Sequence, residues 1–221
     1  MKRALLVMAK QPLAGRSKTR LTPSLSPAAA AGLYACFLRD TLELAQSLST
    51  VTPMVAYAPP AARCYFRRLA PGLDLMEQQG SSLGDRLANV LDQAQACGFE
   101  QVAAINSDSP TLPAAYVSQA FARLDDRETD VVLGPCDDGG YYLIGWKRAH
   151  PRLVREVEMS TRQVLQDTLA LAAEENLRVS LLPTWYDVDT PQDLARVRTD
   201  LSRDSASARH TRRFLATMER T

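Results

Sequence analysis

The sequence predicts a three-layer α/β/α protein built on a mostly parallel central sheet. Short apolar runs alternate with amphipathic helices, which is the pattern of strand–helix–strand units joined by right-handed crossovers. The runs at 130–133 and 141–146 follow one another with no helix between them, which predicts one antiparallel excursion. A chain of 221 residues can bury about 70% of its unfolded surface, so one domain needs no disulfide or metal for its core.

The first half of the chain supplies the strands expected at the sheet centre. Residues 4–9 are continuously apolar, as in a strand buried on both faces. After a polar loop, Ser26 and Pro27 form an N-cap followed by proline at the first helical position. The other elements expected here are strands at 54–57 and 73–76 and a helix at 83–97.

The second half repeats the alternation. It predicts a strand at 101–106, a helix from Pro113, the two strands named above, a helix from 160 to about 175, a strand at 179–182 and a helix from Thr190. Ser160 and Gln163 have the capping-box spacing, and Thr190, Pro191 and Asp193 are expected to cap the last of these helices. We therefore expect one domain over 1–201. Residues 202–221 are rich in arginine, and we expect a solvated tail there, with a surface helix or a partner contact as alternatives.

Composition excludes several function classes. Lys and Arg total 26 against 25 Asp and Glu, a net charge of +1, which argues against a protein that coats nucleic acid or anionic membranes. No apolar run reaches membrane length. The four cysteines, Cys36, Cys64, Cys97 and Cys136, show no C-x-x-C spacing and are interpreted as small hydrophobic residues in a reducing compartment, with Cys136 the exception to watch. We expect a cytoplasmic protein.

The first candidate site loop, residues 12–23, follows the first strand. In an open α/β sheet, ligands bind beyond the carboxyl ends of the strands. Arg16, Lys18 and Arg20 place three cations within five residues, and Gly15 allows the backbone to approach a ligand. Such a loop suits a di- or triphosphate. The alternative is a solvated basic loop, because neither a Walker A loop nor a G-x-G-x-x-G fingerprint is present.

Carboxylates follow two of the later strands. Asp108 comes directly after the strand at 101–106, and Asp187 and Asp189 alternate just before the last predicted helix. Alternate residues of an extended segment point the same way, and hard cations such as Mg²⁺ or Mn²⁺ take several oxygen ligands. A shared metal site is one interpretation. The other is that these residues only cap helices or close Asx turns.

Two further loops carry glycine beside an acid. Asp137, Asp138, Gly139, Gly140 and Tyr141 form a tight turn that could approach an acceptor, with Asp138 the stronger candidate, although a plain hairpin is the alternative. Gly84 and Asp85 open a helix, where a base, ribose or phosphate could bind; a plain connector is equally compatible.

Histidine is missing from all of these loops. His150 and His210 lie elsewhere, which argues against a Ser-His-Asp hydrolase and a His-ligated zinc enzyme. Carboxylates and a cationic loop remain, which are the residues needed for metal-assisted transfer from a nucleotide di- or triphosphate.

The motifs together resemble a family of bacterial transferases with the nucleotide-diphospho-sugar transferase (GT-A-like) fold. These motifs are Pro-x-x-Gly-x-x-Lys-Thr-Arg-Leu-x-Pro (12–23), Leu-Gly-Asp-Arg-Leu (83–87), Ser-Asp-Ser-Pro (107–110), Gly-Pro-x-x-Asp-Gly-Gly-Tyr-Tyr-Leu-Ile-Gly (134–145) and Asp-Val-Asp-Thr-Pro-x-Asp-Leu (187–194). Members are often described as glycosyltransferases of proposed arsenosugar pathways, and 2-phospho-L-lactate guanylyltransferase is a near relative.

The resemblance implies roles for individual residues. Lys18 and Arg20 would hold nucleotide phosphates, Asp108 and Asp189 would bind the metal with Asp187 as the fallback, and Asp138-Gly139-Gly140 would lie by the acceptor. The sequence departs from the fold's usual D-x-D because Asn106 stands two positions before Asp108.

Three functions follow from this reading. The first is a metal-dependent glycosyltransferase or sugar-nucleotide transferase using Mg²⁺ or Mn²⁺, with Asp138 or Asp137 positioning or deprotonating a small-molecule acceptor. The alternative is a nucleotidyltransferase that couples a nucleoside triphosphate to a small phosphorylated acceptor and releases pyrophosphate. The third is a nucleotide-binding module without catalysis. No nucleic-acid or membrane partner is expected, and a homodimer is one candidate for the oligomeric state.

Overall fold

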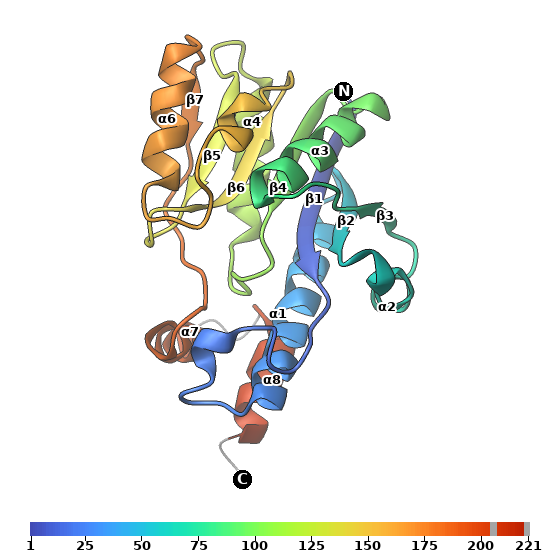
Figure 1. Ribbon diagram of the computed structural model, residues 1–221, viewed down its shortest axis with the longest axis vertical. Coiled ribbons are helices and arrows are strands. Elements are labelled where there is room, and N and C mark those ends of the chain that lie inside the picture. The colour runs from blue at the N-terminus through green and yellow to red at the C-terminus, as the bar shows by residue number, and fades with distance from the viewer. Residues whose placement is uncertain (204–206, 219–221) are drawn as a thin grey trace.

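The computed structural model describes residues 1–203 and 207–218 and contains a seven-stranded sheet (Figure 1). The strands are β1 (Arg3–Lys10), β2 (Thr52–Ala58), β3 (Asp74–Glu77), β4 (Gln101–Ile105), β5 (Val131–Pro135), β6 (Tyr141–Trp146) and β7 (Val179–Leu181). The helices are α1 (Pro27–Ser47), α2 (Arg63–Leu69), α3 (Leu83–Ala96), α4 (Ala114–Asp125), α5 (Arg152–Arg155), α6 (Val164–Glu174), α7 (Pro191–Arg203) and α8 (Arg209–Met218), with 3-10 turns η1 (Thr19–Leu21) and η2 (Pro60–Ala62).

The sheet has the mixed topology that the sequence predicts. Its strand order is β3-β2-β1-β4-β6-β5-β7. All strand pairs are parallel except those of β6, which runs antiparallel to both β4 and β5. The excursion expected after residue 130 is therefore confirmed. It leaves the carboxyl ends of β1, β4 and β5 at one edge of the sheet, together with the start of β6.

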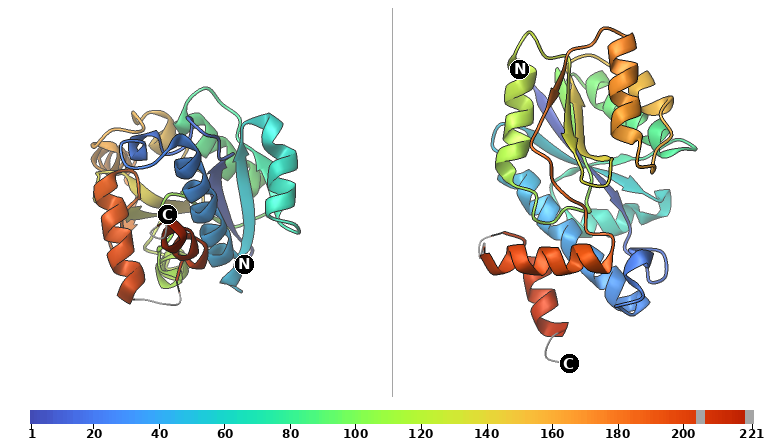
Figure 2. Two further views of the ribbon diagram at one scale, coloured as in Figure 1. Left: turned by 90° about the horizontal axis from the view of Figure 1, so that it is seen from below. Right: turned by 90° about the vertical axis from the view of Figure 1, so that its left-hand side faces the viewer.

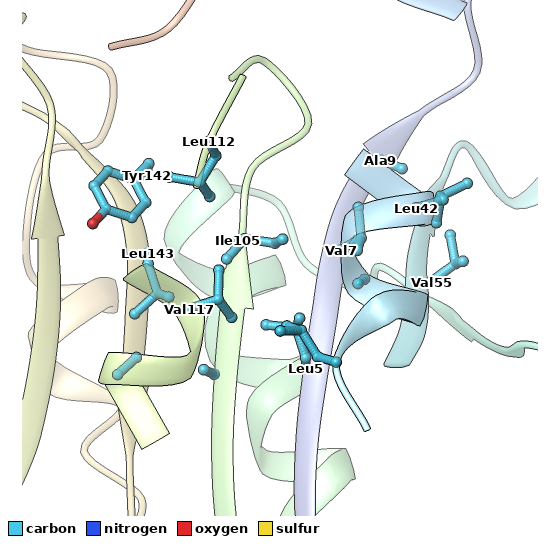
Figure 3. Packing of buried hydrophobic residues seen from close by; sticks show 14 of the residues in the cluster. Leu5, Val7, Ala9, Leu42, Val55, Ile105, Leu112, Val117, Tyr142 and Leu143 are labelled. Carbon is cyan, nitrogen blue, oxygen red and sulfur yellow. The ribbon is translucent and has the colours of Figure 1, made fainter. Parts of the chain in front are cut away.

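The alternation of side chains along β1 divides the core into two layers. Leu5 and Val7 pack in the cluster that α1, α2 and α4 form on one face of the sheet (Figure 3). Ala4 and Leu6 face the other cluster, which includes side chains of α3, α5 and α6. β1 is apolar at consecutive positions because helices cover both of its faces. The three-layer α/β/α architecture is thus confirmed.

A third cluster lies beyond the carboxyl edge of the sheet. It joins the start of α1 to α7 and α8, which lie together at one end of the molecule (Figure 2). Leu215 of α8 is 4% exposed and Thr211 is fully buried. Residues 209–218 are therefore a packed helix rather than a solvated tail, and α7 continues past residue 201 to Arg203. Residues 204–206 and 219–221 of the predicted tail lie outside the described part.

The start of α6 differs from the prediction. Ser160 adopts a left-handed backbone (φ 68°), which is incompatible with the extended N-cap conformation of a capping box. The helix begins at Val164 without a side-chain cap, and its Leu165 N–H donates to the Gly139 carbonyl at 2.9 Å. A carbonyl of a neighbouring loop thus accepts from an N–H at the start of α6, a role for which the sequence pattern predicts the Ser160 side chain. The sequence also did not predict the short helices α2 and α5.

Among the described residues, no helix combines the length and the apolar character needed to cross a membrane.

Candidate functional site

Lys18 joins the two carboxylates predicted to share a site. Its ammonium Nζ lies 2.5 Å from Asp108 Oδ1 and 2.8 Å from Asp189 Oδ1. The Lys18 side chain is only 5% exposed, whereas the carboxyl side chains are 37% and 38% exposed. Burial alone lowers the pKa of a lysine, but here the two carboxylates outweigh it and raise the pKa of Lys18, so the ammonium stays charged. Segments 90 and 171 residues apart along the chain thus meet at one cation.

The loop after β1 aims this lysine inward. Lys18 has a left-handed backbone (φ 49°), and Gly15 adopts φ 74°, which glycine tolerates without strain. The buried Ser17 accepts a hydrogen bond from Leu13 N–H at 3.0 Å and thereby fixes the turn. The Lys18 ammonium also lies 5.5 Å from the centre of the Phe37 ring, within cation–π range. Arg16 and Arg20, by contrast, are exposed.

A buried hydrogen-bond network anchors the segment that carries Asp108. Ser107 Oγ lies 2.9 Å from the hydroxyl of Tyr34 and donates to Met8 C=O at 2.9 Å. The same tyrosine hydroxyl accepts from Lys10 N–H at 3.2 Å. Burial, and secondly the Asp108 charge, raise the pKa of Tyr34 to about 12. This network ties the end of β4 to the end of β1 and to α1, behind the carboxylate.

Asp187 is a partly buried acid near Asp108 and Lys18. Its Oδ1 accepts hydrogen bonds from Asn106 Nδ2 at 2.8 Å and from Ser109 Oγ at 2.5 Å. Burial and the nearby Asp108 charge raise the pKa of Asp187 to about 6. The thiol of Cys136 lies 3.6 Å from the same oxygen, and burial and the Asp187 charge raise the pKa of that thiol. Asn106 therefore serves Asp187 as a donor, where a D-x-D aspartate would add a fourth carboxylate to Asp108, Asp187 and Asp189.

The start of α7 fixes Asp189. Asp193 Oδ2 accepts from the backbone N–H of Asp189 at 3.1 Å and of Thr190 at 2.8 Å, and Thr190 Oγ1 accepts from Asp193 N–H at 3.3 Å. This is the reciprocal bonding of a capping box, so the prediction for this helix start is confirmed. Thr190 and Asp193 make the cap, which leaves the Asp189 carboxylate to Lys18.

The predicted acceptor loop lies at the same edge of the sheet but holds its acids differently. Asp137 is ion-paired with Arg196 of α7, whose guanidinium lies 3.8 Å above the Tyr186 ring. Asp138 Oδ1 accepts from Gly140 N–H at 2.9 Å, which closes an Asx turn. Gly139 has φ 92°, and a Cβ there would lie 2.1 Å from the Arg162 carbonyl oxygen. Glycine is therefore required at this position by the turn and by the close approach.

Three other predicted site residues, Tyr141, Gly84 and Asp85, take part in packing or helix capping. The Tyr141 hydroxyl lies 3.8 Å from Met159 Sδ, its partly buried ring packs against the core cluster of α3, α5 and α6, and burial raises the pKa of this tyrosine. Gly84 packs α3 against α5, because a Cβ there would lie 1.9 Å from the Val154 carbonyl oxygen. Asp85 forms a capping box with Ser82 at the start of α3. Their roles as acceptor- and nucleotide-binding residues stay predictions.

Asp108 and Asp189 are placed so that they could share a divalent cation, because they already share one cation, the ammonium of Lys18. A single ammonium contacts Asp108 and Asp189, and oxygen ligands of this kind suit Mg²⁺ or Mn²⁺. Among the described residues, one group of Asp, Glu and His has ligand atoms all within 4.8 Å of one another, namely Asp40, Glu43 and His210. There, Asp40 accepts from Thr211 N–H and Oγ1 at 2.9 and 2.6 Å, so the group fastens α8 to α1.

Several residues of the site were missed from the sequence. Tyr34 looks like one more apolar position of α1, Arg196 like a solvated helix residue, and Ser109 like part of a turn. Of these residues, only Asn106 could be noticed in the sequence, because it stands where the D-x-D pattern of the fold would have an aspartate. The other contacts join segments that no local pattern relates.

Comparison with known proteins identifies the family. The model of the DUF2064 family, described as uncharacterized protein conserved in bacteria, matches residues 41–161. The chain belongs to this family. A 2-phospho-L-lactate guanylyltransferase from Methanothermobacter thermautotrophicus is 29% identical over 189 residues, which cover 82% of this chain and 78% of that protein.

Solved structures confirm the GT-A-like fold. A candidate nucleotide-diphospho-sugar transferase from Desulfovibrio desulfuricans G20 superposes with a TM-score of 0.91 and 30% identity, over 99% of this chain and 96% of that chain. Glucosyl-3-phosphoglycerate synthase from Mycobacterium tuberculosis, solved with Mn²⁺, uridine diphosphate and glucosyl-3-phosphoglycerate, shares the fold at a TM-score of 0.55 and 12% identity, over 91% and 79% of the two chains. The protein is a nucleotide-dependent transferase.

Proposed function

We propose that the protein is a nucleotidyltransferase, which couples a nucleoside triphosphate to a small phosphorylated acceptor and releases pyrophosphate. The observation that carries this proposal is the contact of Lys18, which belongs to the cationic loop at 16–20, with Asp108 and Asp189 at the carboxyl edge of the sheet. A triphosphate needs cations along its length, and this loop supplies three. The guanylyltransferase relative, which aligns with 82% of the chain, supports the same reaction class.

Each part of the site has a task in this proposal. Lys18, Arg16 and Arg20 offset phosphate charge, and Gly15 lets the loop backbone approach the phosphates. Asp108 and Asp189 would hold Mg²⁺ or Mn²⁺, with Asp187 beside them. When bound, such an ion neutralises charge that develops on the leaving diphosphate. Charge stabilisation and positioning then provide most of the rate enhancement, as in other phosphoryl-type transfers.

The bond changes balance without a redox partner. An oxygen of the acceptor's phosphate attacks the α-phosphorus and forms a new P–O bond. The bond from that phosphorus to the bridging oxygen breaks, and its electrons leave with pyrophosphate. A phosphate oxygen is already deprotonated near neutral pH, so this acceptor needs no general base.

The turn at 137–140 would face the acceptor. Gly140 N–H orients the Asp138 carboxylate, and Arg196 holds Asp137. Asp138 would position the acceptor rather than deprotonate it when the attacking group is a phosphate. Gly139, which has no side chain, would let the backbone of this turn approach the acceptor.

Glycosyl transfer from a nucleotide sugar is the second candidate. The Desulfovibrio structure, described as a candidate nucleotide-diphospho-sugar transferase, matches 99% of the chain and favours glycosyl transfer. In that reaction Asp138 or Asp137 would deprotonate an acceptor hydroxyl, and a nucleoside diphosphate would leave.

Product analysis separates the two reactions. The chain is incubated with Mg²⁺ and either the nucleoside triphosphates plus small phosphorylated acids, 2-phospho-L-lactate included, or UDP- and GDP-sugars plus the same acceptors. We expect pyrophosphate release with one triphosphate, lost in Asp108→Asn and retained in Asp74→Asn, which changes an exposed carboxylate of β3. Release of UDP or GDP from a sugar donor without any pyrophosphate would instead establish glycosyl transfer.

A further inference from the structure

We propose that Lys18 is a built-in counter-ion that keeps Asp108 and Asp189 closed to divalent cations until the phosphates of a nucleotide draw its ammonium away. The first observation is where the ammonium lies. It contacts both carboxylates at 2.5 and 2.8 Å, and its side chain is 5% exposed, so it occupies the space between them rather than passing over them. A metal ion liganded by both acids would need that space.

Electrostatics makes the two cations exclusive. An ammonium and a divalent ion a few ångströms apart in a partly buried site repel strongly, because the local dielectric constant is low. Neighbouring groups add to the hold on the lysine: Phe37 presents its ring 5.5 Å from Nζ, and Tyr34 presents its ring at 5.9 Å. A divalent ion arriving alone therefore meets a site whose negative charge is already compensated.

The Lys18 ammonium can also move away from the two carboxylates. Its ammonium sits at the end of a flexible four-carbon stem. Arg16, Thr19 and Arg20 of the same loop are exposed, so a ligand can reach this part of the loop from solvent. Triphosphate oxygens bound by Arg16 and Arg20 offer the ammonium a new set of acceptors. Once it moves to them, both carboxylates become available to a metal.

Cooperative binding of metal and nucleotide follows. Displacing the ammonium costs free energy when the metal binds alone, and the phosphates supply that free energy when both bind. By linkage, the metal must strengthen nucleotide binding by the same factor as the nucleotide strengthens metal binding. The role of the nucleotide rests on the proposed function; the competition between Lys18 and the metal does not.

The test measures binding of Mn²⁺ alone, by electron paramagnetic resonance of the free ion. Lys18→Met removes the ammonium and keeps an apolar stem, Lys18→Arg keeps the charge, and Lys147→Met removes a lysine that follows β6 at the opposite edge of the sheet. We expect Lys18→Met to bind Mn²⁺ at least about tenfold more tightly than the unchanged protein, with no gain in the other two variants. Equal affinity in all four proteins, or no binding in any, would overturn the proposal.

A second measurement uses the unchanged protein, in case Lys18→Met does not fold. Lysine side-chain ammonium NMR with ¹⁵N-lysine should show Lys18 protected from exchange, and Mg²⁺ alone should leave its signal in place. Inorganic triphosphate with Mg²⁺ should shift it; a signal displaced by Mg²⁺ alone would contradict the proposal. If Lys18→Met gains Mn²⁺ affinity but the unchanged protein turns over no triphosphate, the proposed function is refuted and the competition between Lys18 and the metal stands. Turnover by the unchanged protein without that gain in the variant would do the reverse.

Discussion

Asp187 makes the stability of the protein depend on pH in a direction opposite to that of most carboxyl groups. Burial and the Asp108 charge raise its pKa to about 6 in the folded protein, against about 3.9 for an unfolded aspartate. The folded state therefore binds the Asp187 proton more tightly. Its contribution to stability is complete below about pH 4 and is lost as the pH rises through 6. Two pKa units correspond to an upper bound of about 3 kcal/mol.

Asp187→Asn should remove this dependence, because an amide keeps one oxygen acceptor for Asn106 and Ser109 and does not titrate. Urea unfolding of both proteins is measured between pH 4 and 7.5 with EDTA present. The free energy of unfolding of the wild type minus that of the variant should fall by up to about 3 kcal/mol across this range. Taking this difference cancels the titrations that the two proteins share. Asp74→Asn, at an exposed carboxylate of β3, should follow the wild type. A difference that stays flat or rises with pH would refute the reasoning.

Two further substitutions test the packing and the hydrogen bonds around the site. Gly84→Ala places a methyl group 1.9 Å from the Val154 carbonyl oxygen, so α3 and α5 must separate. Urea unfolding should show that the free energy of unfolding falls by about 1–3 kcal/mol. An unchanged unfolding midpoint would contradict the close approach. Asn106→Leu removes the donor to Asp187 and the acceptor of Asp108 N–H. The free energy of unfolding should fall by about 1–3 kcal/mol, and the pKa of Asp187 should rise further. A pH profile of stability that matches the wild type would show that Asn106 does not support Asp187.

The fold could be predicted from the sequence because its main signals are local. The continuous apolar run at 4–9 indicates a strand buried on both faces, and the absence of a helix between β5 and β6 indicates the antiparallel strand. The caps at Ser26 and Thr190 are local as well, and both are formed. Ser160 has equally good spacing, but Gly139 satisfies the helix end from another loop, which local spacing cannot show.

The site could be predicted in its residue types but not in its pairings. Carboxylates after strands and a cationic loop after β1 were visible, and the fold brings Lys18, Asp108 and Asp189 together. Which of these groups pair could not be read from the sequence, because the cation for the two acids comes from a loop expected to face phosphate. The packing of α8 was missed for a similar reason. Its arginine-rich sequence resembles a solvated tail, and only the contacts of Asp40 and Glu43 on α1 show where the helix docks.

A thermal-shift screen tests most directly whether this edge of the sheet binds a nucleotide. The protein and its Asp108→Ala variant are melted with ATP, GTP, CTP, UTP, dTTP or UDP- and GDP-sugars, each with Mg²⁺, Mn²⁺ or EDTA. A ligand at a hundredfold excess over its dissociation constant adds about 2.7 kcal/mol, a rise of about 5–10 °C for a chain of this size. We predict such a rise with one nucleotide and metal, reduced by EDTA and absent in Asp108→Ala. No rise with any nucleotide, or an equal rise in the variant, would contradict the account.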